Sequence, residues 1–193
     1  YEWNAVPGEM TYGDLLGYYR QVLLESDSYF GDRLMMCAIC ETAVHAASDI
    51  IFRFKRNVAK IELTINNASG SGMYVQSVQL RQVASRLDVL AGETDHGGRV
   101  YPAYGESDYL DYPELGITVS AGNSEKVVWY VPRNEQGIAS NISSVEKNAY
   151  APAWATYFTI ISGTTDGTGE IKEYKFYPGA NMVNDFNLKP NSR

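Results

Sequence analysis

The sequence predicts a mainly β protein: a Greek-key β-sandwich of about seven short strands, with one helix near the N-terminus. Three observations support this fold class. Short runs of β-branched and aromatic residues are separated by turn-forming Gly, Asn, Asp and Pro. Strand and helix patterns do not alternate, which argues against a parallel α/β fold. The 193 residues include 15 Tyr, a residue that favours half-buried strand surfaces.

The N-terminal segment, residues 1–49, contains the expected helix. Thr11 is a candidate N-cap with Asp14 three residues on. We expect an amphipathic helix at about residues 11–26, packed on the sandwich or extending it, although Gly13 and Gly17 weaken this interpretation. The apolar residues at helical spacing are Tyr12, Leu15, Leu16, Tyr19, Val22 and Leu23.

The strongest strand pattern in the chain covers residues 50–65. Its second half alternates, with Ala59, Ile61, Leu63 and Ile65 on one face and Lys60, Glu62 and Thr64 on the other. Phe52 and Phe54 are out of phase with the buried face. We therefore expect a bulge or bend near residues 56–57.

The rest of the chain reads as strands joined by loops. Residues 125–131 are predicted to form a strand. Within it, residues 127–131 are apolar on both faces, as is typical of a central strand, and Pro132 ends this run. Residues 84–116 and 136–153 are expected to be loops, the first with at most short strands. The other predicted strands are 34–39, 74–83, 117–119, 155–162, 171–177 and a last short one around Phe186 and Leu188, with a hairpin loop at 163–169. No repeat or linker divides residues 50–193, so we expect one sandwich domain there.

Charge and hydropathy exclude several classes of partner. The net charge of -7 argues against nucleic acid, which requires a basic surface, and provides no attraction to anionic lipid. No run of 18 apolar residues is present that would span a membrane. The chain begins at Tyr1 without a signal peptide, so we expect it to be part of a longer exported precursor.

The two cysteines, Cys37 and Cys40, form a Cys-x-x-Cys motif. Such a motif can be a redox pair, half of a zinc site, or two thiols in an apolar segment. A redox pair would need a βαβ unit, and a zinc site would need a second ligand pair. With only His45 and His96 in the chain, we favour two thiols without a metal, although export would permit a disulfide.

No motif indicates catalysis. His45 and His96 have no supporting nucleophile motif, and the Asp95–Gly98 segment is more typical of an exposed turn. The loop around Asp166 has too few carboxylates for calcium, and no phosphate-binding glycine loop is present. We expect no enzymatic activity, no cofactor and no metal.

The remaining candidate site is a Tyr-rich loop at residues 101–112. It combines four tyrosines with nearby carboxylates, a composition that can bind sugars through ring stacking and hydrogen bonds. The simpler interpretation, which we favour, is an acidic loop whose rings cover the edge of the sandwich. The residues concerned are Tyr101, Tyr104, Tyr109 and Tyr112, with Glu106, Asp108, Asp111 and Glu114.

An ordered set of short segments resembles the fimbrillin-like fimbrial subunit family of Bacteroidetes. In chain order the matching segments are Arg-Asn-Val-Ala-Lys-Ile at 56–61, Val-Gln-Leu-Arg-Gln-Val at 78–83, Tyr-Val-Pro-Arg-Asn-Glu-Gln-Gly at 130–137, Ala-Thr-Tyr at 155–157, and residues 174–191. Each segment is weak alone, but the order is fairly specific across residues 50–191. Pro178 and Pro190 depart from the family pattern, and residues 1–49 match poorly.

The resemblance implies a structural or adhesive subunit of a cell-surface fimbrium, exported as a lipoprotein to the outer membrane. It implies that residues 50–193 form the N-terminal, transthyretin-like domain of the family, without the family's second domain. Its partners would be other fimbrial subunits, joined by strand exchange after a trypsin-like protease cleaves behind an Arg. A host or bacterial surface glycan or protein is the second kind of partner that the resemblance implies. The shaft, tip and anchor roles remain open, as does the cleavage site among Arg20, Arg33, Arg53 and Arg56. The alternative is a surface glycan-binding lipoprotein module that uses the loop at 101–112.

Overall fold

A computed structural model describes residues 19–21, 34, 36–38, 49–68, 70, 73–88, 109–140, 142–164 and 171–190. These residues are mainly β, as predicted, and all the strand pairs among them are antiparallel. The strands are β1 (Tyr19–Gln21), β2 (Met36–Cys37), β3 (Lys55–Arg56), β4 (Val58–Asn66), β5 (Met73–Arg81), β6 (Val83–Ala84), β7 (Arg86–Asp88), β8 (Tyr109–Leu110), β9 (Leu115–Val119), β10 (Ser124–Pro132), β11 (Asn134–Ile138), β12 (Tyr157–Thr164), β13 (Lys172–Phe176) and β14 (Asp185–Leu188).

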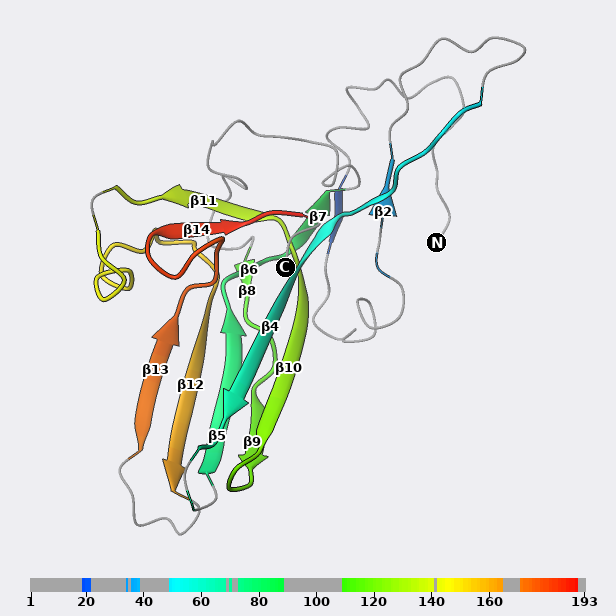
Figure 1. Cartoon of the computed structure of the whole chain (residues 1–193). Helices are drawn as coiled ribbons and strands as arrows, with labels where there is room; N and C mark the ends of the chain where they lie inside the picture. The colour runs from blue at the N-terminus through cyan, green and yellow to red at the C-terminus, as the bar shows by residue number, and fades with distance from the viewer. Residues whose placement is uncertain are drawn as a thin grey trace.

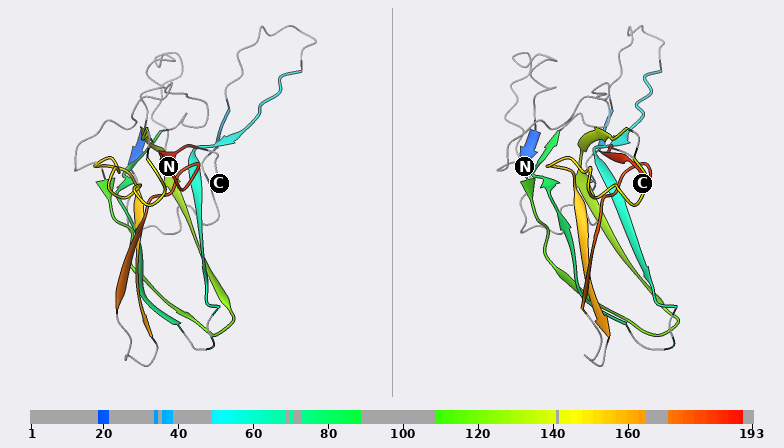
Figure 2. Two further views of the ribbon diagram at one scale, coloured as in Figure 1. Left: turned by 60° about the vertical axis from the view of Figure 1, so that its left-hand side comes forward. Right: turned by 90° about the vertical axis from the view of Figure 1, so that its left-hand side faces the viewer.

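Two sheets form the body of the protein (Figure 1). The larger sheet has the strand order β13-β12-β5-β9, and the smaller one pairs β4 with β10. Four further two-stranded sheets pair β11 with β14, β6 with β8, β1 with β7 and β2 with β3. Figure 2 shows the long strands of both main sheets running side by side below the shorter ones.

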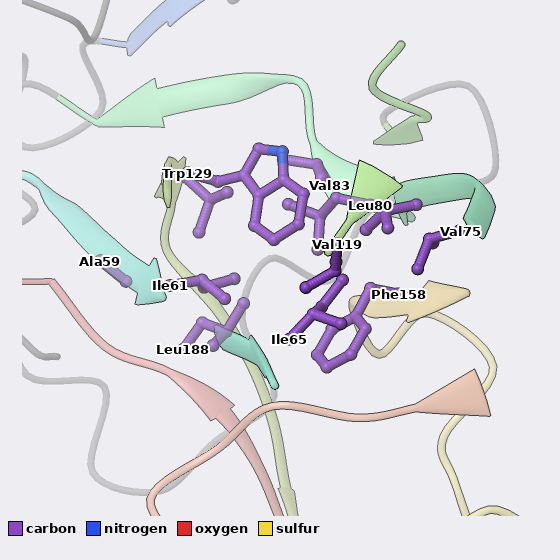
Figure 3. Packing of buried hydrophobic residues seen from close by; sticks show 12 residues of the cluster. Ala59, Ile61, Ile65, Val75, Leu80, Val83, Val119, Trp129, Phe158 and Leu188 are labelled. Atoms are coloured by element: carbon purple, nitrogen blue, oxygen red, sulfur yellow. The ribbon is translucent and has the colours of Figure 1, made fainter. Parts of the chain in front are cut away.

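One apolar core lies between the two main sheets. It combines residues of β4 and β10, such as Ile61 and Trp129, with residues of the larger sheet, such as Leu80 and Phe158 (Figure 3). Val78, Leu80 and Val119 are fully buried. Burial of each such side chain contributes about 1.5–3 kcal/mol, so this shared core holds the two sheets together.

The predicted alternation in β4 is confirmed. Ala59, Ile61 and Ile65 are buried, whereas Thr64 is exposed. The predicted change of direction near residues 56–57 is also present, because the fully buried Asn57 bends the chain between β3 and β4. Residues 50–54 precede this bend as an extended segment outside the strands.

Two predictions about the strands need correction. Residues 134–138, assigned mostly to a loop, form β11, because they pair with β14 across about fifty residues of sequence. Within the described residues β10 has one partner strand, β4, and is not central in a sheet. Its outward residue Val128 is exposed, so apolar residues on both faces did not indicate two-sided burial.

The helix predicted at 11–26 is absent where the structure describes that segment. Tyr19–Gln21 form β1, which pairs with β7. Isolated helices of this length are marginal, and the two glycines lower helix propensity further, so strand pairing with a distant segment overrides the helical pattern. The rest of the predicted helix lies outside the described residues. In the part of the chain that is described, no helix is long and apolar enough to cross a membrane.

Candidate functional site

A groove of about 780 Å³ opens between the smaller sheet and the β12–β13 side of the larger one. One wall is the stretch 60–65 of β4, and the opposite wall is formed by Phe158 and Ile160 of β12 and Phe176 of β13. The remaining side is lined by residues 178–180 and Met182, and in and after β14 by Asp185, Asn187, Leu188 and Lys189. We call this space the β4 groove.

The walls are apolar because the inner faces of both sheets continue into the groove. Ile61 and Ile65 are buried, while Leu63, Ile160 and Phe176 are only half-buried and pack against the core from its edge. Phe158 and Phe176 stack with ring centroids 5.4 Å apart. The groove is therefore an opening of the core toward solvent, with aromatic and aliphatic side chains on both sides.

The outer edge of β4 borders this opening. In the described residues β4 pairs with β10 on one side, and no described strand pairs with its other side. β13 is likewise an edge strand of its sheet. Main-chain N–H and C=O groups on such an edge are available to pair with an additional strand.

The turn between β13 and β14 forms the far side of the groove and is held rigidly. The buried Asp185 carboxylate accepts hydrogen bonds from the main-chain N–H of Ala180 at 3.1 Å and of Asn187 at 2.8 Å. Gly179 lies so close that a Cβ there would be 2.1 Å from the Asp185 carbonyl oxygen. This side of the groove is therefore preformed and tolerates only glycine at residue 179.

A buried lysine secures the same turn from behind. Lys147 is 3% exposed, and its Nζ donates hydrogen bonds of 2.8 Å to the carbonyl oxygens of Tyr177 and Asn181. The ammonium also lies 5.1 Å from the centroid of the Phe186 ring. Desolvation lowers the pKa of Lys147, and the nearby Asp185 partly opposes this shift.

Charged residues mark the rim of the groove. Glu62 on the outer face of β4 is held between Lys60, at 3.1 Å, and Lys126 of β10. Lys189 at the other side lies 3.9 Å from the buried carboxylate of Glu135. The rim is therefore polar and the walls are apolar, as in a site for an extended peptide whose alternate side chains enter the groove.

The structure places two tyrosines of the predicted loop away from the groove. Tyr109 stacks on Trp154, with centroids 5.3 Å apart and planes at 7°, and its hydroxyl accepts a hydrogen bond from Gln136. The Tyr112 hydroxyl donates to the Tyr130 carbonyl oxygen at 3.3 Å, and its ring packs on the core. Both rings are half-buried.

Two acidic residues of that loop, Asp111 and Glu114, lie in the described part of the chain. Asp111 accepts hydrogen bonds of 2.9 Å from the Arg81 side chain and from the main-chain N–H of Gln82, which ties the loop to the end of β5. Glu114 is exposed. The other predicted site residues, Tyr101, Tyr104, Glu106 and Asp108, lie outside the described residues.

The other candidate residues fall mainly outside the described chain. Cys37 is buried on β2, while Cys40, His45, His96 and Asp166 are not among the described residues. Within the described ranges no three His, Cys, Asp or Glu residues gather as metal ligands would.

The groove itself was not predicted from the sequence. Its wall residues Leu63, Ile160 and Phe176 look like ordinary inward-facing residues of strands, and their partial exposure depends on how far the sheets diverge. The sequence pattern that bears on the groove is the alternation of apolar and polar residues in β4. This alternation identifies the inner face of the strand, but it does not show that one edge of β4 has no partner strand among the described residues.

Comparison with known families gives one match. A family model described as "Domain of unknown function (DUF4906)" matches residues 129–193, from within β10 through β14. This segment includes the turn and β14 that form one side of the β4 groove. No curated protein and no solved structure matches the chain.

Proposed function

We propose that this protein is a structural or adhesive subunit of a cell-surface fimbrium that assembles by β-strand addition. The observation that carries the proposal is the β4 groove, an apolar opening of the core beside the edge of β4 that no described strand covers. An added strand would gain main-chain hydrogen bonds along the edge and bury alternate side chains in the groove.

The resemblance of residues 50–191 to fimbrillin-like subunits supports the same function. We propose on this basis that the two main sheets form a Greek-key, transthyretin-like sandwich, and that the protein is exported as a lipoprotein to the outer membrane. Its role would be architectural, without catalysis or a cofactor. The matched family of unknown function assigns no activity, so the groove and the resemblance together carry the proposal.

The test is a polymerisation assay on the full-length precursor without its lipid anchor. The protein is treated with a trypsin-like protease, run unboiled on a denaturing gel and viewed by electron microscopy. We expect a ladder and visible fibres, because an added strand closes a core and dissociates slowly.

A groove variant makes this assay specific. Ile160→Lys places a charge on the wall of the groove, where it opposes strand insertion. Val145→Lys, at a residue that is 89% exposed and does not line the groove, is the matched control. Circular dichroism first establishes that both variants are folded. A ladder that persists in folded Ile160→Lys would refute strand addition at this groove.

A further inference from the structure

A segment of unusual exposure precedes β4. Residues 49–54, here called the apolar arm, are extended and carry four large apolar side chains. Their exposed fractions are 44% for Ile50, 68% for Ile51, 54% for Phe52 and 63% for Phe54. A cluster of exposed large apolar residues on a folded domain marks an interaction surface.

The arm has the pattern of a strand that buries one face. In an extended chain Ile50, Phe52 and Phe54 point to the same side, and Ile51 and Arg53 to the other. Its six residues match in length the six residues of β4, 60–65, that line the groove. At ~3.3 Å per residue, both stretches are about 20 Å long.

The arm cannot enter the groove of its own molecule. Only Asn57 separates β3 from β4, and a hairpin needs a loop of at least about two residues. Asn57 is also fully buried, as is Val58 at the start of β4, so the connection is fixed. Figure 1 and Figure 2 show the arm leading away from the sandwich in all three views.

We propose that the apolar arm of one copy inserts into the β4 groove of a second copy. This inference rests on the proposed function, because it identifies the added strand. It requires that processing occur ahead of the arm, behind Arg20 or Arg33, because cleavage behind Arg53 or Arg56 would sever the arm from its own domain. Ile50, Phe52 and Phe54 would face Phe158, Ile160 and Phe176, while the arm's main chain pairs with the edge of β4. Burial of aromatic and aliphatic side chains on both partners drives the contact.

Charge favours the same pairing. The arm and the adjoining β3, residues 49–56, contain one acidic residue, Asp49, and three basic ones, Arg53, Lys55 and Arg56, for a net charge of +2, whereas the whole chain has a net charge of -7. This basic segment is therefore attracted at long range to the acidic body of a neighbour, although the rim of the groove itself carries lysines as well as Glu62. Because arm and groove are different surfaces, the contact is head-to-tail and leaves one arm and one groove open at the ends, which is the geometry of a filament.

Two folded variants test the proposal in a mixing experiment. Phe52→Asp with Phe54→Asp disables the arm, and Ile160→Lys disables the groove. Each variant alone is expected to be monomeric by analytical ultracentrifugation, because its missing element blocks every contact. An equimolar mixture is expected to form 1:1 dimers and nothing larger, because only one arm and one groove remain competent.

Two controls make the result specific. Ile138→Asp with Val145→Asp removes two other exposed apolar side chains and should leave self-association unchanged. A labelled peptide of residues 49–56 should bind the arm-disabled protein in fluorescence anisotropy. A peptide of the same composition in scrambled order should bind about tenfold more weakly or worse, because it loses the alternation that fills the groove.

The outcomes separate this inference from the proposed function. If the arm-disabled protein still forms the protease-induced ladder while the Ile160→Lys variant does not, the groove accepts another strand and the arm is not the donor. If the mixture stays monomeric and the peptide does not bind, the arm–groove contact is overturned. Dimers in the mixture together with peptide binding establish the contact.

Discussion

At the scale of single residues, the four consecutive polar side chains of residues 133–136 are all buried, because they pair with one another. Arg133 Nε lies 2.7 Å from Glu135 Oε1, and the two side chains are only 6% and 3% exposed. Asn134 and Gln136, between and beside them, are also buried and hydrogen-bonded to one another. A sequence pattern of four polar residues indicates a surface loop, but mutual pairing offsets the cost of burying them.

Removing one member of the ion pair should be costly. Glu135→Gln removes the carboxylate charge 2.7 Å from the buried Arg133 guanidinium, and we expect a loss of about 3–5 kcal/mol in the free energy of unfolding. Urea denaturation measures this loss. The double variant Arg133→Met with Glu135→Leu should lose much less, because it removes both buried charges. A double variant as unstable as the single one would contradict a cost that arises from the charge imbalance.

Gly179 should not tolerate a side chain. A Cβ at this position would lie 2.1 Å from the Asp185 carbonyl oxygen, so Gly179→Ala must displace the turn that lines the groove. We expect a loss of about 1–3 kcal/mol, measured by thermal or urea unfolding. Gly70→Ala is the matched control, because a Cβ at residue 70 would meet no heavy atom within 4 Å, and it should be nearly neutral.

Lys147 should make stability depend on pH in the alkaline range. Burial lowers its pKa in the folded state, so the unfolded state holds the proton to higher pH. The cost of burying the charge is therefore fully present below the folded-state pKa and is relieved as pH rises toward the ordinary value of about 10.4. The free energy of unfolding of the wild type should therefore rise with pH relative to that of Lys147→Met. The variant also loses the hydrogen bonds to two carbonyl oxygens, but this loss of stability is the same at every pH. Lys175→Met, at an exposed residue, is the control.

At the scale of secondary structure, hydrogen bonds from residues at the strand ends connect β11 to the segments next to β5 and β12. Gln82, at φ 54°, separates β5 from β6, and its carbonyl oxygen accepts a hydrogen bond of 2.8 Å from the Thr156 hydroxyl. Asn134 at the start of β11 donates to the same Thr156 hydroxyl at 2.8 Å and to the Trp154 carbonyl oxygen at 2.9 Å. These contacts anchor β11 to the segments that lead out of β5 and into β12.

Asn134 should therefore be required for docking of β11. Asn134→Asp keeps the side-chain acceptor but loses both donors and adds a buried charge, so we expect a loss of at least about 2 kcal/mol. Asn134→Ala should cost about 1–3 kcal/mol. Native-state hydrogen exchange should show the loss of protection concentrated in β11 and β14. Uniform loss across β5 and β12 would contradict a local anchoring role.

At the scale of the whole molecule, an acidic body and a segment that is both basic and apolar, residues 49–56, lie on one chain. Association through the arm should be fast at low salt and slower when charges are screened. We expect the rate of arm-peptide binding to fall about tenfold or more between about 0.05 M and 0.5 M NaCl, as measured by stopped-flow fluorescence. The dissociation rate should change little, because it depends mainly on the buried apolar side chains. A dissociation rate that rises with salt instead would indicate a contact held by charges.

The sequence by itself determined the β class, the inner and outer faces of β4, the bend near Asn57 and most of the long strands. These features follow from local alternation and turn chemistry, which adjacent residues encode. It also marked Phe52 and Phe54 as out of phase with the buried face of β4, and both side chains are exposed in the structure.

Only the tertiary structure decided which strands pair and where the core opens. β1 replaces part of the predicted helix and β11 part of a predicted loop because each pairs with a segment far away in sequence. Among the described strands, the β4 groove exists because the smaller sheet ends at β4 while the larger one continues to β13. The number of strands in a sheet depends on long-range pairing, so no local pattern could have indicated that one strand position was open.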